Sequence, residues 1–130
     1  MDRKKIEYEK AKLNYDDRKY AFNMIVEFNK LDNDYMEYIE GVSIIIDHID
    51  DVIDCVYEAE RQRKTSDELY NLAISTVRCA SSQVEEAIGN IFDFLSGKSE
   101  TKVEYLCSEI AIVLVAVVCT NISLRSFLSK

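Results

Sequence analysis

Apolar residues recur at alternating intervals of three and four over long stretches of this chain, and this spacing most constrains its fold. One complete series comprises Tyr35, Tyr38, Val42, Ile45, Ile49, Val52, Val56 and Ala59. A second comprises Ala73, Val77, Ala80, Val84, Ala87, Ile91 and Phe94. Such spacing places every member of a series on one face of an α-helix. With no proline and three glycines in 130 residues, few positions interrupt a helix.

The pattern predicts an all-α protein in which four long antiparallel helices form a helical bundle within a single domain, residues 1–130. The expected helices span residues of about 2–30, 33–63, 66–96 and 100–128. Thr65 and Glu68 have the spacing of a capping box that would open the third helix. Gly97 is expected to end that helix. The first helix carries two apolar stripes, one through Tyr15 and one through Leu13, and the sequence leaves open which faces the bundle.

The fourth segment contains IAIVLVAVVC at residues 110–119, and a helix with this sequence has no polar face. We expect a second subunit to cover it, so that the protein is a homo-oligomer. The expected interface residues point away from the bundle: Ile112, Val115, Cys119 and Ile122. The alternative is that this helix is the central helix of the monomer. Because a bilayer span takes about 20 apolar residues, no membrane span is predicted.

Negative charge is concentrated in one segment. Residues 31–60 contain ten acidic residues and no lysine or arginine, in a chain of net charge −8. On the predicted helix, seven of these carboxylates lie opposite the apolar series: Glu37, Glu40, Asp47, Asp50, Asp51, Asp54 and Glu58. The strip is a solvated face, a docking face for a protein with a basic surface, whose approach it would steer, or a face that binds divalent metal ions. Direct binding of nucleic acid is disfavoured because the strip repels phosphates.

The cysteines and the single histidine give little sign of chemistry. Cys55, Cys79, Cys107 and Cys119 are widely spaced, which is typical of free thiols in a reducing cytoplasm. Zinc would require clustered thiols or more histidines. His48 lies at the edge of the apolar series and is interpreted as structural. We therefore predict no catalytic residue and no cofactor.

The second half of the chain, residues 83–128, resembles the MazG-like all-α nucleotide pyrophosphohydrolases. In that family an EExxE helix, a short turn and an ExxD helix place carboxylates around Mg²⁺, which activates water against a nucleoside triphosphate. Here Glu85 and Glu86 open the first motif and Glu109 opens the second. Gly89 stands where the third glutamate of the first motif is expected, and Ile112 where the aspartate of the second is expected. The resemblance implies that Glu86 and Glu109 would be the surviving Mg²⁺ ligands, helped by Glu85 or Asp93.

Two functions follow from these patterns, and the sequence does not separate the first of them from a structural or adaptor role based on assembly through the fourth helix. The first is a non-enzymatic acidic helical protein of the cytoplasm that binds, and thereby inhibits, another macromolecule. Immunity proteins, antitoxins and phage proteins that counter bacterial defence share its small size, acidity and lack of catalytic motifs. The alternative is a divergent MazG-like protein that binds nucleotides or hydrolyses them with Mg²⁺. The sequence leans towards the non-enzymatic function.

Overall fold

The computed structural model describes residues 3–31, 33–97 and 103–129. These residues form four long α-helices and contain no strand: α1 (Arg3–Phe28), α2 (Asn33–Arg61), α3 (Asp67–Ser96) and α4 (Val103–Leu128). The predicted all-α bundle is confirmed. Residue 2 and residues 100–102, where the first and fourth helices were expected to begin, lie outside the described residues.

Three helix ends show how local sequence sets the boundaries. The N-cap of α3 is Ser66, whose side chain accepts a hydrogen bond from the Leu69 backbone N–H at 3.2 Å. The prediction of Thr65 as the capping residue is therefore wrong by one position, because Ser66 is the residue whose hydroxyl reaches a free N–H of the first turn. Gly97 ends α3 as predicted, at a left-handed φ of 71°. Arg63 ends α2 in the same left-handed region, with φ 57°.

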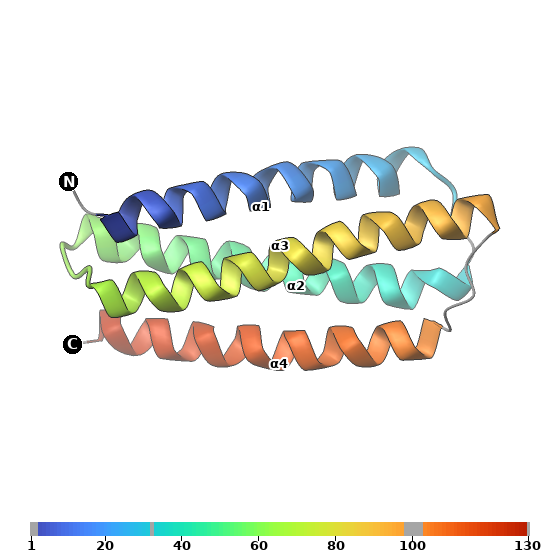
Figure 1. Cartoon of the computed structure of the whole chain (residues 1–130). Helices are drawn as coiled ribbons and strands as arrows, with labels where there is room; N and C mark the ends of the chain where they lie inside the picture. Colours follow the sequence, from blue (N-terminus) through green and yellow to red (C-terminus); the bar gives the residue numbers. More distant parts are fainter. Residues whose placement is uncertain (1–2, 32, 98–102, 130) are drawn as a thin grey trace.

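Consecutive helices are antiparallel, but the most extensive contacts join helices that run in the same direction. α1 packs along α3, and α2 packs along α4. In Figure 1, α2 and α3 occupy the middle of the bundle, while α1 and α4 lie at opposite edges. Each edge helix therefore turns one face to the bundle and the opposite face to solvent.

The core is built from the predicted apolar series. Every member of the α2 series from Tyr38 onward is buried, and so is every member of the α3 series. In α1 the stripe that faces the bundle includes Tyr8, Tyr15 and Phe22, all at most 2% exposed. Leu13, on the other stripe, is 63% exposed. The structure thus decides a question that the periodicity left open.

The apolar helix α4 is an edge helix, which rules out the alternative that it is the central helix of the monomer. Its buried side chains lie along one face: Leu106, Ile110, Val117, Asn121 and Leu124. Two polar contacts fix this face on its neighbours. The Asn121 Nδ2 donates to the backbone oxygen of His48 at 3.0 Å, and the hydroxyls of Thr76 and Thr120 are 2.9 Å apart. α2 and α3 cover α4 from one side only.

Candidate interaction surface

The outer face of α2 carries an open row of carboxylates. Glu40, Asp47, Asp51 and Asp54 are exposed, and none of them forms an ion pair with another described residue. Their spacing of three, four and seven residues places them on one face of the helix, opposite the buried series. We refer to these four residues as the acidic strip. Like charges three or four residues apart destabilise a helix by a few tenths of a kcal/mol per pair, so the strip has a small structural cost.

Asp50, the fourth carboxylate of the predicted face, turns towards α1. It accepts hydrogen bonds from the Tyr15 hydroxyl at 3.0 Å and from the Lys19 ammonium at 2.8 Å. Tyr15 also donates to the backbone oxygen of Ile46 at 3.2 Å. Burial raises the pKa of Tyr15 well above its ordinary value, and the charge of Asp50 adds to the rise. Asp50 therefore joins α2 to α1 instead of facing solvent freely.

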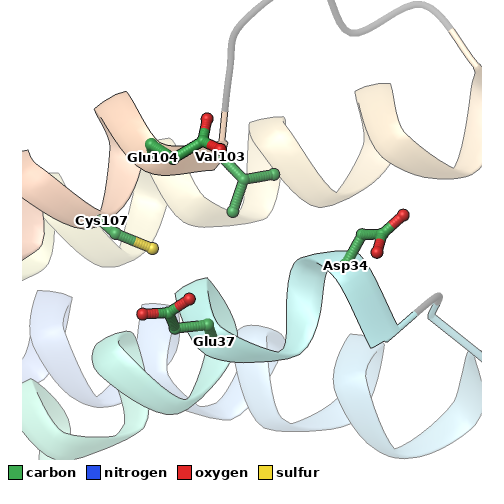
Figure 2. Close-up of a pocket in the computed structure, with 5 residues that line it drawn as sticks. All are labelled: Asp34, Glu37, Val103, Glu104 and Cys107. Carbon is green, nitrogen blue, oxygen red and sulfur yellow. The ribbon is translucent and has the colours of Figure 1, made fainter.

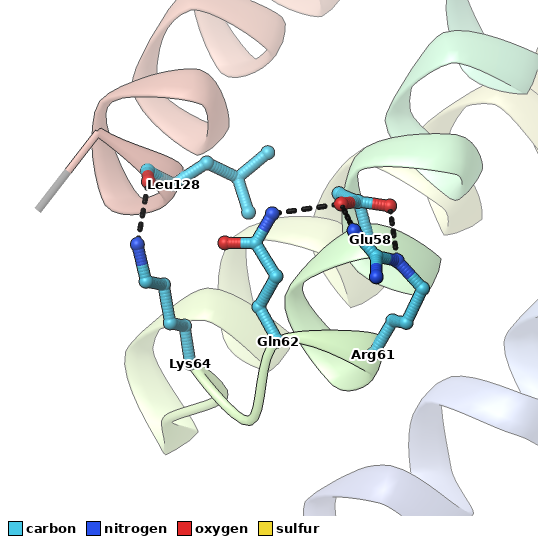
Figure 3. Close-up of polar contacts among 5 residues, drawn as sticks. All are labelled: Glu58, Arg61, Gln62, Lys64 and Leu128. Carbon is cyan, nitrogen blue, oxygen red and sulfur yellow. Dashed lines mark hydrogen bonds and ion pairs between the residues drawn. The ribbon is translucent and has the colours of Figure 1, made fainter.

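Glu58, the last carboxylate of the predicted face, is also engaged within the chain. Its carboxylate accepts hydrogen bonds from the guanidinium of Arg61 and from the Gln62 amide (Figure 3). These hydrogen bonds lower the pKa of Glu58 to about 2. Next to this cluster, the Lys64 ammonium donates to the Leu128 carbonyl at the end of α4, at 2.9 Å. A cation at a helix C-terminus is favourable for the helix dipole.

Glu37, the first carboxylate of the predicted face, lies beside α4. Figure 2 shows the cavity there, of about 470 Å³, lined by Asp34, Glu37, Val103, Glu104 and Cys107. Three carboxylates therefore face one opening between the starts of α2 and α4. Burial raises the pKa of the Cys107 thiol, and the charge of Glu37 adds to the rise. The thiol is accordingly neutral at ordinary pH and lacks the reactivity of a thiolate.

A second groove, of about 280 Å³, continues along the same two helices and shares Glu37 and Cys107 with the first. Its lining is mainly apolar and includes Ile44, Ile110 and Leu114, while Glu37 and Glu40 lie on its α2 side. The two cavities are therefore adjacent, the first lined mainly by acidic residues and the second mainly by apolar ones. We refer to them together as the α2–α4 groove.

The outer face of α4 is apolar and exposed. Ile112, Val115 and Ile122 are 72%, 64% and 65% exposed, and Cys119 is also exposed. All four predicted interface residues thus point away from the bundle. By length and composition α4 is the one described helix that could cross a membrane, and 22% of its most apolar stretch is buried. Core helices of soluble proteins pass the same test, but they are mostly buried, whereas α4 is not.

The carboxylates of the MazG-like motif divide between two sides of α3. Glu85 lies towards α1, where its carboxylate is 4.0 Å from the Arg18 guanidinium. Glu86 is exposed, and its charge adds to the rise in the pKa of Tyr105 on α4 that a hydrogen bond with Glu109 causes. Within the described ranges, no three His, Cys, Asp or Glu side chains form a group that could hold a metal ion.

Sequence reasoning missed the α2–α4 groove. The residues that complete it, such as Asp34, Glu104 and Ile44, lie on two helices whose pairing cannot be read from either one. The groove could have been suspected from Ile44, an aliphatic residue among the carboxylates of the outer face of α2, which is exposed in the structure. Comparison with protein-family models, with curated proteins and with solved structures finds no match for this chain.

Proposed function

We propose that this chain is a non-enzymatic binding protein of the cytoplasm that captures, and thereby inhibits, a protein with a basic surface. The observation that carries the proposal is the acidic strip, whose carboxylates have no cationic partner among the described residues. Unpaired surface charge of one sign attracts a partner of the opposite sign and accelerates its association. Nucleic acid does not suit this face, because its phosphates carry the same charge.

The α2–α4 groove supports the same proposal. Charge alone gives fast but unselective association, whereas buried apolar contacts at the centre of an interface give most of its stability. Ile44 and Leu114 offer such contacts beside Glu37 and Glu40. A partner segment that presents apolar side chains flanked by lysine or arginine would fit both the apolar lining of the groove and the carboxylates beside it. Small acidic inhibitors of the immunity, antitoxin and phage anti-defence types act by covering a partner in this way.

A charge-reversal experiment tests the proposal. A tagged protein is used to isolate a partner from the host, and the identified partner is then titrated against three purified forms. Asp47, Asp51 and Asp54 are changed together to lysine in the first variant. The matched control changes the exposed Asp17, Glu27 and Asp93 to lysine, which alters the net charge by the same amount on other faces.

We expect the strip variant to lose at least tenfold in affinity and to show a flatter dependence on salt, because rim charges act through screened attraction. The control variant should keep the affinity and the salt dependence of the wild-type protein. If the two triple variants bind equally well, the strip is a solvated surface and the proposal fails. Circular dichroism of each variant shows that the helices are intact, which is expected because all six positions are exposed.

The nucleotide-binding alternative depends on Glu86 and Glu109: a hydrogen bond with Glu109 raises the pKa of Tyr105, and the charge of Glu86 adds to the rise. Mg²⁺ needs several oxygen ligands, and a nucleoside triphosphate would have to provide those beyond these two carboxylates. Thermal unfolding with Mg²⁺ and each nucleoside triphosphate tests this, since a ligand that binds only the folded state raises the melting temperature. An unchanged melting temperature throughout removes the alternative.

A further inference from the structure

The exposed face of α4 has its own heptad pattern, separate from the face that packs in the bundle. Its members alternate at intervals of four and three: Ser108, Ile112, Val115, Cys119, Ile122 and Ser126. We refer to these six residues as the outer seam. This is the spacing by which helices pair side by side. No acidic or basic residue occurs between residues 110 and 124, so the middle of the seam is free of charge.

The outer seam forms an apolar surface patch. At their exposures in the monomer, Ile112, Val115 and Ile122 leave roughly 350 Å² of surface in water, comparable to the largest patch on a typical monomer, which is often functional. Ala111 and Ala116 extend this surface on either side and are also exposed. Two such faces in contact would bury on the order of 1,200 Å² with their flanks, at the lower end of the range for specific interfaces.

We infer that a second copy of this chain covers the outer seam, with the two α4 helices antiparallel and crossing at the level of Val117. In this register Ile112 faces Ile122 of the second copy, and Val115 faces its Cys119. Ser108 then faces Ser126 at each end of the contact. Apolar side chains and a cysteine meet in the middle of the contact, and serines meet at its ends. The seam is thus complementary to itself when reversed, as a twofold dimer requires.

Charge favours the antiparallel arrangement. Arg125 is exposed on the α2 side of α4, in the last turn of the helix. The antiparallel register brings it to the level of residue 109 in the second copy, between Cys107 and Ala111, which share the α2–α4 groove with Glu37 and Glu40. A parallel pair would instead place Arg125 at the level of Arg125 in the second copy, away from these carboxylates. Antiparallel helices also align their dipoles favourably.

Other occupants fit the outer seam less well. The basic partner proposed above is attracted to the carboxylates of α2, whereas the middle of the outer seam has no charge to attract it. A lipid surface would also meet the carboxylates Glu37 and Glu40 beside α4, and the anionic lipids of a cytoplasmic leaflet repel them. A second copy brings an uncharged seam of matching length.

The oligomeric state of matched variants tests the inference. Val115→Glu is placed at the centre of the outer seam, and Leu13→Glu on the solvent face of α1 is its control. The two side chains are 64% and 63% exposed in the monomer, so each substitution should be tolerated equally by the monomer fold. Sedimentation velocity over a range of concentrations measures the dissociation constant of the dimer.

We expect the wild-type protein and Leu13→Glu to be dimers at high micromolar concentration. Val115→Glu should raise the dissociation constant at least a hundredfold, because a charge buried without a partner at the centre of an interface is costly. Helical content should stay unchanged in both variants. A monomeric wild-type protein, or equal weakening by both substitutions, overturns the inference.

Disulfide cross-linking tests the register and does not depend on disrupting the contact. In a background with Cys79→Ser and Cys119→Ser, two single variants are prepared, Ile112→Cys and Ile122→Cys. In the proposed register the two copies of position 112 are ten residues apart along the axis, about 15 Å, which exceeds the reach of a disulfide. Mild oxidation should therefore cross-link a mixture of the two variants and neither variant alone. Cross-linking of each variant with itself indicates a parallel pair and overturns the register.

Salt and lipid separate this inference from the proposed function. Two copies of net charge −8 repel one another, so added salt should leave the dimer unchanged or tighten it. Binding of a basic partner to the acidic strip should weaken under the same conditions. The two proposals can therefore fail independently. Co-sedimentation of the wild-type protein with phosphatidylcholine vesicles should recover it in the supernatant, and vesicle binding that is lost in Val115→Glu overturns the inference.

Discussion

Replacing Gly41 by alanine tests how closely α2 and α4 pack. Gly41 lies in the interior of α2, and a Cβ added there would be 2.9 Å from the Cγ2 atom of Ile110 on α4. Contacts below 3.0 Å force a neighbour to move. Ile110 is β-branched and has one strongly preferred rotamer in a helix, so it has little freedom to withdraw. The absence of a side chain at Gly41 is what allows the two helices to approach.

Two effects of opposite sign decide the result. Alanine is better than glycine in a helix interior by about 1 kcal/mol. Overpacking in a well-packed contact costs about 1–3 kcal/mol. Gly41→Ala should therefore range from neutral to about 2 kcal/mol less stable. Gly89 is a matched control, because it also lies within a helix and nothing is within 4 Å of its added Cβ. Gly89→Ala should therefore raise the free energy of unfolding by the full difference in helix propensity, about 1 kcal/mol.

Urea unfolding followed by circular dichroism, at one protein concentration, measures both free energies. The difference between the two variants is the cost of the α2–α4 contact. It should disappear in an Ile110→Leu background, because leucine has no Cγ2 branch at that point, and a double-mutant cycle isolates this coupling. If Gly41→Ala stabilises the protein as much as Gly89→Ala does, the helices are further apart than described and the reasoning is refuted.

Further predictions concern helix ends and buried tyrosines. Arg63→Gly should stabilise the protein by about 0.5–1 kcal/mol and Gly97→Ala should destabilise it by a similar amount, because both positions are left-handed; urea unfolding of the two variants measures both. Burial raises the pKa of Tyr8, Tyr15 and Tyr38, so the folded state holds protons that the unfolded state releases above a pH of about 10. The free energy of unfolding should be pH-independent on this account below that value and fall above it, and spectrophotometric titration should find these three tyrosines un-ionised until the protein unfolds.

The helices themselves could be predicted from the sequence because helix formation depends on local spacing. The α2 and α3 series were predicted residue by residue, and their members from Tyr38 to Phe94 are buried. The N-cap was misplaced by one position because Thr65 and Ser66 are chemically equivalent caps, and only the backbone conformation at Ser66 distinguishes them. The two stripes of α1 were found, but nothing in their composition identifies the buried one.

The arrangement of the helices could not be predicted, and the candidate surface depends on it. Heptad spacing predicts that a helix has a buried face, but it does not predict which other helix packs against that face. The side-by-side packing of α2 and α4 creates the groove and places Glu37 beside Cys107. The approach of α1 to α2 through Tyr15 and Lys19 explains in turn why Asp50 differs from the neighbouring carboxylates of the acidic strip.

The two faces of α4 show the limit of periodicity most clearly. Leu106, Ile110 and Val117 belong to a series that packs on α2 and α3, while Ile112 and Val115 belong to a second series on the opposite side. Both series satisfy the same helical spacing, and one bundle has room to cover one of them. An edge helix that needed only the first series would gain solubility from charged residues on its other face. The middle third of α4 instead carries no charged residue. This absence of charge supports the inference that a second molecule covers the outer seam.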